Sequence, residues 1–406
     1  MPTFEEARDL ILRSAALLGV EVVGLSQTLG RVLATDQISA WDLPMWDNSA
    51  MDGYAVRARD CHKGSVLQVR GYLPAGSAAT QSLAAGTATK ILTGAPIPAG
   101  ADSVVPFEVT EVQGDAVRLL VQPLVGDHIR EQGSDLHAGD CVLNAGTSLG
   151  PAEIAILASL ARTSVPVTRR PRVAILSTGD ELLAPGEPLQ PGRIFDSNGP
   201  ALAAAVRNAG GRPIILPIAR DDPATLRQQL REGLQADVLV TSAGVSTGDR
   251  DLVREVLQDL GAKEVFWKVD IQPGRPMAFA VTDRCCVFSL PGNPVAALLT
   301  FELLVRPALR RMVGHYRPIE VTRRAILGEA VQPRSDRMTL RRVRLKQSDD
   351  QLVAMSSGQQ ATGFVRTLSR ADGIALIPSG TDILPAGTVV DVHPLRQDSD
   401  FGGGAQ

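Results

Sequence analysis

The sequence is poor in aromatic residues and shows no excess of basic charge. Aromatic side chains make up 4% of its 406 residues, and the formal net charge is −3. General nucleic-acid binders carry a basic excess, so that class is not expected here. The four cysteines contain no CxxC pair, and two of them, Cys285 and Cys286, are adjacent in an apolar run. A disulfide framework is therefore not expected.

Membrane segments and several well-known catalytic fingerprints are also missing. No apolar run reaches the roughly 20 residues that cross a bilayer. The first residues, MPTFEEARDLILRS, are acidic and amphipathic, unlike a signal peptide. These features predict a reduced, soluble, cytoplasmic protein. No GxxxxGKS/T, GxGxxG or HExxH motif occurs, so the sequence does not support a P-loop, a dinucleotide fingerprint or a zinc site of that kind. The letters GxSxG occur once, as GVSTG in residues 244–248, and this short match alone does not predict a hydrolase elbow.

The sequence does contain enough apolar residues for several cores. Hydrophobic residues make up 44% of the chain, and its length suggests about two to four domains. A helix is predicted over residues 3–18, because Thr3 and Glu6 fit a capping box and Leu17 lies on the helical period. Short valine-rich runs broken by glycine and proline then predict β-structure. Residues 151–161 predict another helix, with proline at its first position.

The second half of the chain has a different pattern. From RPRVAILSTG to PVAALLTFELLVRPALRRM, fully apolar strands alternate with helices. This alternation predicts a mostly parallel, doubly wound sheet. After about Pro318 the pattern is that of β-structure again, with a hairpin turning at Asp349-Asp350 and a final strand in PAGTVVDVHPL.

Three strands of the predicted parallel sheet end in loops rich in small residues. These loops are LSTGDEL, TSAGVSTGDRD and SLPGNPVA. Ligands of open parallel sheets bind at the carboxyl ends of the strands. The amides of Gly292 and Asn293 could hold a phosphate, and Asp249 and Asp251 could bind Mg²⁺ together with phosphate oxygens. The loops therefore suggest a phosphorylated ligand with a divalent metal, and the alternative is a set of ordinary turns and helix starts.

Two further groups of residues are candidate site residues. Lys268 and Arg275 flank a Pro-Gly turn and could bind an oxyanion, although surface solvation is the alternative. In the N-terminal half, Asp52 in DNSAMDGYAV, Thr93 in KILTGAPIPAGAD and Asp135 in GSDLHAGD form a second set. Each of these three also fits an ordinary turn.

These six motifs and WKVDIQPGRP, the stretch that contains Lys268 and Arg275, make seven motifs. In this order and spacing they resemble the molybdopterin molybdenumtransferase (MoeA) family, which is related to the E domain of gephyrin. The resemblance extends from about Thr3 to Pro394. It implies an enzyme of molybdenum cofactor biosynthesis, a transferase that inserts molybdenum from molybdate into adenylylated molybdopterin and releases AMP with Mg²⁺. Alternatives are adenylylation of molybdopterin, a scaffold role and a tungsten-preferring relative. The long N-terminal half, the C-terminal β-region and the acids in the site loops argue against the first two.

The resemblance also implies a domain organisation and partners. It implies an elongated mixed dimerisation domain, an inserted β-domain, a molybdopterin-binding α/β domain that resembles the molybdopterin-adenylyltransferase fold, a C-terminal β-barrel and a flexible tail. Their expected ranges are 1–45 with 133–168, 46–132, 169–314, 315–396 and 397–406. The family resemblance further implies a homodimer whose cleft is shared between subunits. Transient contacts with molybdopterin adenylyltransferase and with cofactor-accepting enzymes are expected, without nucleic-acid or membrane partners.

Site residues are carried over from the matching motifs. The implied catalytic residues are Asp52, Asp135, Glu181, Asp221, Asp251 and Lys268, of which Asp221 and Asp251 are the implied metal ligands. The implied substrate-binding residues are Thr93, Asp180, Ser242, Gly244, Ser246, Arg275, Ser289, Pro291, Gly292 and Asn293.

The sequence departs from the family pattern at three positions. Ala243 stands where a second glycine is common, Gln272 where many members have a second lysine, and Ser134 where an acid is frequent. Gln272 lowers the positive charge near Lys268, which weakens the case for an oxyanion site there, although Arg275 remains. None of these changes removes a whole motif.

Overall fold

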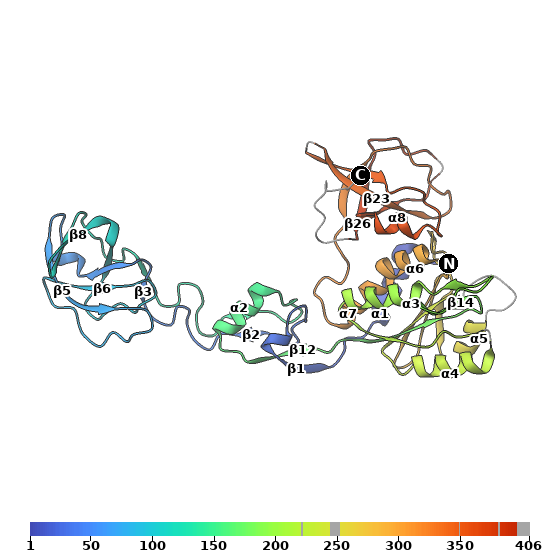
Figure 1. Cartoon of the computed structure of the whole chain (residues 1–406), viewed down its shortest axis with the longest axis horizontal. Helices are drawn as coiled ribbons and strands as arrows, with labels where there is room; N and C mark the ends of the chain where they lie inside the picture. Colours follow the sequence, from blue (N-terminus) through green and yellow to red (C-terminus); the bar gives the residue numbers. More distant parts are fainter. Residues whose placement is uncertain (221, 244–251, 349, 381, 396–406) are drawn as a thin grey trace. The chain divides into compact units, whose positions relative to one another are not determined.

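The computed structural model describes residues 1–220, 222–243, 252–348, 350–380 and 382–395 (Figure 1). The chain divides into two compact units. Unit 1 consists of Met1–Ala34, Ala145–Pro151 and Ser164–Gln406, and unit 2 consists of Thr35–Asn144 and Ala152–Thr163. Each unit has its own sheets and apolar clusters. The multidomain α/β class predicted from the sequence is confirmed.

Unit 1 contains a six-stranded sheet with the strand order β16-β13-β17-β21-β20-β18. Neighbours among the first four strands are parallel, while β20 and β18 run antiparallel to their neighbours. The strands are β13 (Arg172–Ser177), β16 (Arg212–Ile215), β17 (Val238–Ser242), β18 (Lys263–Phe266), β20 (Ala278–Val281) and β21 (Cys286–Leu290). All residues of β17 and β21 are buried, as expected for strands covered on both faces. The predicted doubly wound sheet is thus confirmed.

Helices cover both faces of this sheet (Figure 1). One apolar cluster lies between the sheet and α4 and α5, and a larger one lies between the opposite face and the remaining helices of the domain. The helices are α1 (Phe4–Ser14), α3 (Asn198–Asn208), α4 (Pro223–Gly233), α5 (Leu252–Asp259), α6 (Pro294–Thr300) and α7 (Arg306–Met312), with a π-helical turn at Phe301–Val305 between the last two.

The first helix shows where local sequence signals succeed and fail. The predicted capping box is present: Glu6 N donates to Thr3 Oγ1 at 3.2 Å, and Thr3 N donates to Glu6 Oε2 at 2.9 Å. The helix nevertheless ends at Ser14, and the prediction that it continues to residue 18 is wrong. Leu17 is 65% exposed, and Leu18 N donates instead to Met312 O. A tertiary contact with α7 therefore replaces the last predicted turn.

A closed five-stranded barrel follows the central sheet. Its strands join in the cycle β23-β24-β22-β26-β25-β23, which confirms the predicted C-terminal barrel. They are β22 (Arg323–Leu327), β23 (Met338–Ser348), β24 (Gln351–Ser356), β25 (Gly373–Ile377) and β26 (Val389–Pro394), with α8 (Val365–Ser369) beside them. The pairing Ser348↔Gln351 confirms the predicted hairpin. A short strand, β19 (Ile271–Gln272), pairs in parallel with the start of β23.

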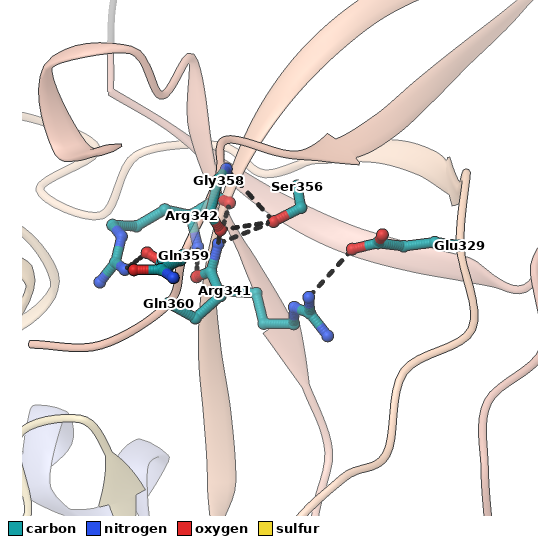
Figure 2. Close-up of polar contacts among 7 residues, drawn as sticks. All are labelled: Glu329, Arg341, Arg342, Ser356, Gly358, Gln359 and Gln360. Atoms are coloured by element: carbon teal, nitrogen blue, oxygen red, sulfur yellow. Dashed lines mark hydrogen bonds and ion pairs between the residues drawn. The ribbon is translucent and has the colours of Figure 1, made fainter. Parts of the chain in front are cut away.

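A buried arginine holds a loop against the barrel wall (Figure 2). Arg342 on β23 is 0% exposed, and within the described residues no carboxylate pairs with it. Its Nη2 donates to the carbonyls of Gln359 and Ala361, at 2.7 and 3.2 Å, and burial lowers the pKa of its guanidinium. The side chain of Gln360 accepts from Arg342 N at 3.0 Å and donates to Arg342 O at 3.1 Å. At Arg342, the Gln360 side chain therefore makes the backbone hydrogen bonds that a neighbouring strand would otherwise make.

Replacing Gln360 with alanine should weaken the barrel. Gln360→Ala removes both bonds to the backbone of Arg342, and at roughly 1 kcal/mol each we expect a loss of about 2 kcal/mol. Gln359→Ala is the matched control, because Gln359 is exposed and its side chain makes no hydrogen bond shown in Figure 2. Hydrogen exchange of β23 and β24 peptides measures the difference. Equal protection in the two variants would contradict this account of the loop.

Unit 2 contains a six-stranded sheet with the order β7-β4-β6-β5-β9-β8. Its strands are β4 (Gly53–Val56), β5 (Val66–Leu73), β6 (Thr87–Ile91), β7 (Ser103–Pro106), β8 (Thr110–Gln113) and β9 (Ala116–Leu119). Two small ladders also lie in this unit, β2 (Gln37–Ile38) with β11 (Cys141–Leu143) and β3 (Asn48–Ser49) with β10 (Ile129–Arg130). The sheet buries its own apolar residues, among them Val56, Ile91 and Val117.

Short elements complete the two units. Helix α2 (Pro151–Ser159) starts at the end of a unit 1 segment and continues in unit 2. Unit 1 also has the pairs β1 (Val20–Gly24) with β12 (Ser164–Thr168) and β14 (Leu182–Leu183) with β15 (Ile194–Phe195). The 3₁₀ turns are Leu25–Gln27, Ala58–Asp60 and Phe107–Val109. Among the described residues, every helix is too short or too polar to span a bilayer.

Candidate active site at the carboxyl edge of the central sheet

The three loops predicted from the sequence start at the same edge of the central sheet. Strands β13, β17 and β21 are parallel neighbours, so their carboxyl ends meet. Thr178 N donates to Ser242 O at 3.1 Å, which joins the first loop to the second. Ala243 N donates to Leu290 O, also at 3.1 Å, which joins the second loop to the third. The sheet therefore brings the starts of LSTGDEL, TSAGV and SLPGNP together.

A buried asparagine that sequence reasoning missed links two of these loops. Asn198 is 7% exposed and starts α3. Its Nδ2 donates to Ser242 Oγ at 2.6 Å and to Gly292 O at 2.7 Å. The Asp196 carboxylate, also 7% exposed, accepts from the backbone amides of Asn198 and Gly199, both at 3.0 Å. The only sequence signal is an acid and an amide in FDSNGP, which equally fits an ordinary helix start.

The two predicted serines point to opposite faces of the sheet. In the β17–β21 ladder, Ser242 pairs with Leu290 and Thr241 pairs with Ser289. Paired residues of neighbouring strands share a face, and successive residues alternate. Ser242 therefore lies on the α3 side, whereas Ser289 lines a cavity of about 20 Å³ on the α5 side together with Trp267.

The acids of the first loop are exposed. Asp180 and Glu181 both lie at the surface. Arg220 Nη1 donates to the carbonyls of Asp180 and Leu182, at 3.0 and 2.8 Å, which fixes the backbone of the loop. Gly179 has a φ of +142°, and a Cβ there would overlap the Glu181 carboxylate. Glycine thus allows the Glu181 side chain to fold back over the loop.

Two half-buried cations flank the turn after β18. Val269 N donates to Arg275 O at 3.1 Å, so the two arms of the WKVDIQPGRP turn are joined. Lys268 and Arg275 are both half-buried. Within the described residues, neither cation forms an ion pair with an acid, and Arg275 Nε is buried without a partner. Buried cations are normally paired, so this turn is suited to an anionic ligand.

A third basic residue comes from the barrel. Ile271 pairs with Met338, which places Arg337 directly beside this turn. Arg337 holds the pKa of Asp336 below its usual value, with a smaller contribution from Arg275. Sequence reasoning missed Arg337 because the pairing of β19 with β23 joins segments far apart in the chain.

The N-terminal candidates lie in unit 2. Thr93 donates to Asp52 Oδ1 from its amide at 2.7 Å and from its hydroxyl at 2.8 Å. The hydrogen bond from the backbone amide of Thr93 is the main reason why the pKa of the Asp52 carboxyl is lowered. Asp135 is exposed, and its amide donates to Leu43 O at 2.9 Å. The structure thus joins Asp52 to Thr93, and it shows no bond from either of them to Asp135.

Asp42 is a further residue of unit 2 that sequence reasoning missed. Its carboxylate accepts from Ala138 N at 2.8 Å and from Gln132 Nε2 at 2.9 Å. These bonds lower the pKa of Asp42 and tie the GSDLHAGD segment to the chain before the DNSAMDG motif. The motif WDLP that contains Asp42 gave no signal beyond a proline turn.

Four predicted site residues lie outside the described residues: Asp221, Gly244, Ser246 and Asp251. Two of them, Asp221 and Asp251, are the predicted metal ligands. Among the residues that the structure does describe, no group of three or more His, Cys, Asp or Glu could hold a metal ion. Exposed Asp180 and Glu181 are the described carboxylates of the first loop. The metal site therefore stays a prediction from the sequence.

Three family models match the chain. Residues 2–161 match the MoeA N-terminal region (domain I and II). Residues 174–311 match a probable molybdopterin binding domain, and residues 324–395 match the MoeA C-terminal region (domain IV).

Named relatives cover most of the same length. Molybdopterin molybdenumtransferase 2 of Mycobacterium tuberculosis is 39% identical over 387 residues, 92% of this chain and 94% of the relative. Molybdopterin molybdenumtransferase of Nostoc sp. is 42% identical over 327 residues, 77% of this chain and 75% of the relative. A crystal structure of a molybdopterin biosynthesis moeA protein from Pyrococcus horikoshii OT3 aligns with a TM-score of 0.83 at 29% identity, covering 97% of this chain and 100% of the other.

Proposed function

This chain belongs to the molybdopterin molybdenumtransferase (MoeA) family, a transferase family of molybdenum cofactor biosynthesis, and we propose that it inserts molybdenum from molybdate into adenylylated molybdopterin and releases AMP. The proposal adds to family membership the adenylylated form of the substrate, the released nucleotide and a divalent cation, Mg²⁺. The first two are what the resemblance to the family implies, and a divalent cation also suits a ligand that carries several negative charges.

The half-buried and unpaired cations of the WKVDIQPGRP turn carry the proposal. Neither Lys268 nor Arg275 forms an ion pair with an acid among the described residues, although Asp336 is close enough to Arg275 for its pKa to be lowered by it. Arg337 lies beside them. A purely structural pair of basic residues would be expected to find carboxylates or full solvation. A site for molybdate and phosphate oxygens explains why these charges stay available. Gln272 in place of a second lysine leaves the turn with fewer charges, and the neighbouring Arg337 is itself paired with Asp336.

The described residues have separate tasks in this proposal. Lys268 and Arg275 bind oxyanions and reduce their mutual repulsion, since two unit charges ~4 Å apart interact by about 4 kcal/mol at an effective dielectric near 20. Ser242 and the Gly292–Asn293 turn hold the phosphate of the substrate. Ser242 and Gly292 are held by Asn198 before the ligand arrives, so they can stabilise developing charge without reorganising. Mg²⁺, when bound, would neutralise phosphate oxygens during P–O cleavage.

The remaining sequence-derived assignments are kept as part of the proposal. Asp221 and Asp251 are proposed as the Mg²⁺ ligands. Asp180 and Glu181 are proposed at the mouth of the pterin and phosphate pocket. Ser289, near the end of β21, and Pro291, directly after that strand, are proposed as substrate-binding residues. Further proposed site residues are Asp52, Thr93, Asp135, Gly244 and Ser246.

A homodimer is also part of the proposal. In unit 1, the short β1 strand exposes Val20 at 61% and Val22 at 68%, and nearby Leu17 is 65% exposed. Aliphatic side chains gathered on one exposed segment suit contact with a second copy of the chain. Sedimentation equilibrium measures the mass in solution, and a monomer at all concentrations would remove this part of the proposal.

Lys268→Ala should impair use of molybdate. Loss of a charge-assisted hydrogen bond is expected to raise KM for molybdate about 10- to 100-fold. The measurement is AMP release from adenylylated molybdopterin at varied molybdate concentration, with Mg²⁺. Lys263→Ala is the control, because Lys263 is an exposed lysine of the adjacent strand and should leave KM unchanged. AMP release that is independent of molybdate in the wild type would refute the proposed reaction.

A further inference from the structure

The amide of Asn198 has a defined orientation. The carbonyl of Gly292 can only accept hydrogen bonds, so the group that faces it at 2.7 Å must be the NH₂ of Asn198. The same NH₂ lies 2.6 Å from Ser242 Oγ and uses its second hydrogen there. Asn198 is 7% exposed and packed at the start of α3, and two acceptors fix its NH₂. The direction of both hydrogen bonds is therefore set.

This orientation determines what Ser242 can do. Its oxygen accepts from Asn198, so its own hydrogen is left to donate elsewhere. Among the described residues, no acceptor takes that hydrogen. Ser242 is 2% exposed and ends β17, at the edge where the three loops start. A buried hydroxyl with an unused hydrogen at such an edge needs an acceptor.

The geometry points to Asn198 as the positioning residue that makes Ser242 a hydrogen-bond donor to the phosphate of the substrate. This inference rests on the proposed function, since the phosphate is that of the adenylylated substrate. By holding Gly292 O as well, Asn198 keeps the third loop at a fixed distance from Ser242. The Asn198 side chain thus sets the direction in which the Ser242 hydroxyl donates, and it also sets the position of the loop that contains Gly292.

The neighbourhood of Asn198 supports a positioning role rather than simple packing. Among the residues that the structure describes, its Oδ1 is buried without a partner, and so is Ser177 Oγ, which is 3% exposed. A residue chosen for stability alone would satisfy these groups or be apolar. The Asp196 carboxylate holds the backbone of Asn198 by accepting a hydrogen bond from its backbone N–H at 3.0 Å. Asn198 is therefore held in place both through its backbone and through its side-chain NH₂.

Three variants test the inference with AMP as the probe, because AMP carries the phosphate and binds without turnover. Ser242→Ala removes the donor, Asn198→Ala removes its orientation, and the double variant removes both. Isothermal calorimetry gives the Kd for AMP. We expect each single variant to raise Kd about 10- to 100-fold. The double variant should lose no more than the larger single loss, because both changes remove the same bond.

Asn198→Asp replaces the NH₂ donor with a carboxylate oxygen, which can only accept, while the size and shape of the side chain stay the same. A carboxylate would accept from the Ser242 hydroxyl and face the Gly292 carbonyl with a second acceptor, so Kd should rise at least as much as in Asn198→Ala. Gln229→Ala is the matched control. Gln229 is a buried amide of α4, 9% exposed, whose Oε1 also lacks a partner within the described part of the chain. Its removal should leave Kd unchanged. In turnover, the site variants should raise KM for the adenylylated substrate more than they lower kcat.

The outcomes separate this inference from the proposed function. Unchanged Kd in Ser242→Ala would overturn the inference even if the Asn198 variants failed to fold. Additive losses in the double variant, or no binding of AMP by the wild-type protein, would overturn it as well. A wild-type protein that binds AMP but transfers no molybdenum would refute the proposed function, while the pattern of Kd values would still decide the role of Asn198.

Discussion

Replacing Gly53 with alanine is expected to destabilise unit 2 by about 3 kcal/mol or more. Gly53 is buried at the start of β4, where it pairs with both Ile91 and Pro106. A Cβ at this position would overlap the carbonyl oxygen of Val105 and lie 2.8 Å from its carbonyl carbon and 3.0 Å from Pro106 Cα. These are backbone atoms, so no side-chain rotation can make room. Overpacking usually costs about 1–3 kcal/mol, and a required backbone shift places this site at or above that range.

The same substitution should disturb a candidate site residue. Asp52 directly precedes Gly53, and its carbonyl accepts from Phe107 N at 3.2 Å. A shift of β4 from β7 would therefore move the Asp52 carboxylate away from Thr93. Hydrogen exchange of β4 and β7 peptides measures the loss. Gly24→Ala is the control, because a Cβ there meets no atom of the described chain within 4 Å. Similar protection of β4 in both variants would contradict the steric account.

Asp237→Ala is expected to destabilise unit 1 by about 2–3 kcal/mol. The Asp237 carboxylate accepts two hydrogen bonds from the Arg169 guanidinium and one from Arg172 N, all at 2.7 Å. Removing one partner of a buried ion pair costs roughly 3–5 kcal/mol. The expected loss here is smaller, because the Arg169 side chain is 38% exposed and water can solvate the guanidinium that remains. Thermal unfolding of the variant and the wild type at neutral pH measures the difference.

The contribution of Asp237 should depend on pH. Burial alone would raise the pKa of Asp237, but the hydrogen bonds from Arg169 and Arg172 outweigh burial and lower it. A carboxyl group whose pKa is lower in the folded state stabilises the fold when ionised. The stabilisation is complete above the ordinary pKa of about 3.9 and disappears as pH falls through the lowered value. The difference in unfolding free energy between the wild type and Asp237→Ala should therefore disappear at acidic pH.

A surface pair provides the comparison for Asp237. Asp259 is 64% exposed and pairs with Arg227 at 2.9 Å. Exposed pairs contribute roughly 0–1 kcal/mol, so Asp259→Ala should change stability little at any pH. An equal loss of stability in both variants would contradict the role given to the Arg169–Asp237 pair. A stability difference between the wild type and Asp237→Ala that stays constant as the pH is lowered would contradict it as well.

Local signals in the sequence predicted the elements well where local contacts decide them. The capping box at Thr3 and Glu6 depends on residues three apart, and it is present. The alternation of apolar strands and helices predicted the central sheet, because strands covered on both faces must be apolar. The end of the first helix was predicted wrongly, since a bond from Leu18 to Met312 decides it and no local pattern reports that contact.

The site is less visible in the sequence because strand register and long-range pairing build it. Ser242 and Ser289 look equivalent in their loops, yet register turns them to opposite faces of the sheet. Asn198 acquires its role only because α3 starts beside two loops that lie 44 and 94 residues further along the chain. Arg337 joins the candidate site through one short strand pairing. The roles of the predicted residues, and the predicted domain boundaries, stay predictions.

The most direct test of the central claim is to measure molybdenum in the pterin product. The purified protein would be incubated with adenylylated molybdopterin, molybdate and Mg²⁺, the pterin fraction isolated, and its molybdenum determined by mass spectrometry beside the AMP released. We predict equal amounts of pterin-bound molybdenum and AMP, with both products reduced in Lys268→Ala when molybdate is limiting. AMP released without molybdenum in the pterin fraction would contradict the claim that this chain transfers molybdenum.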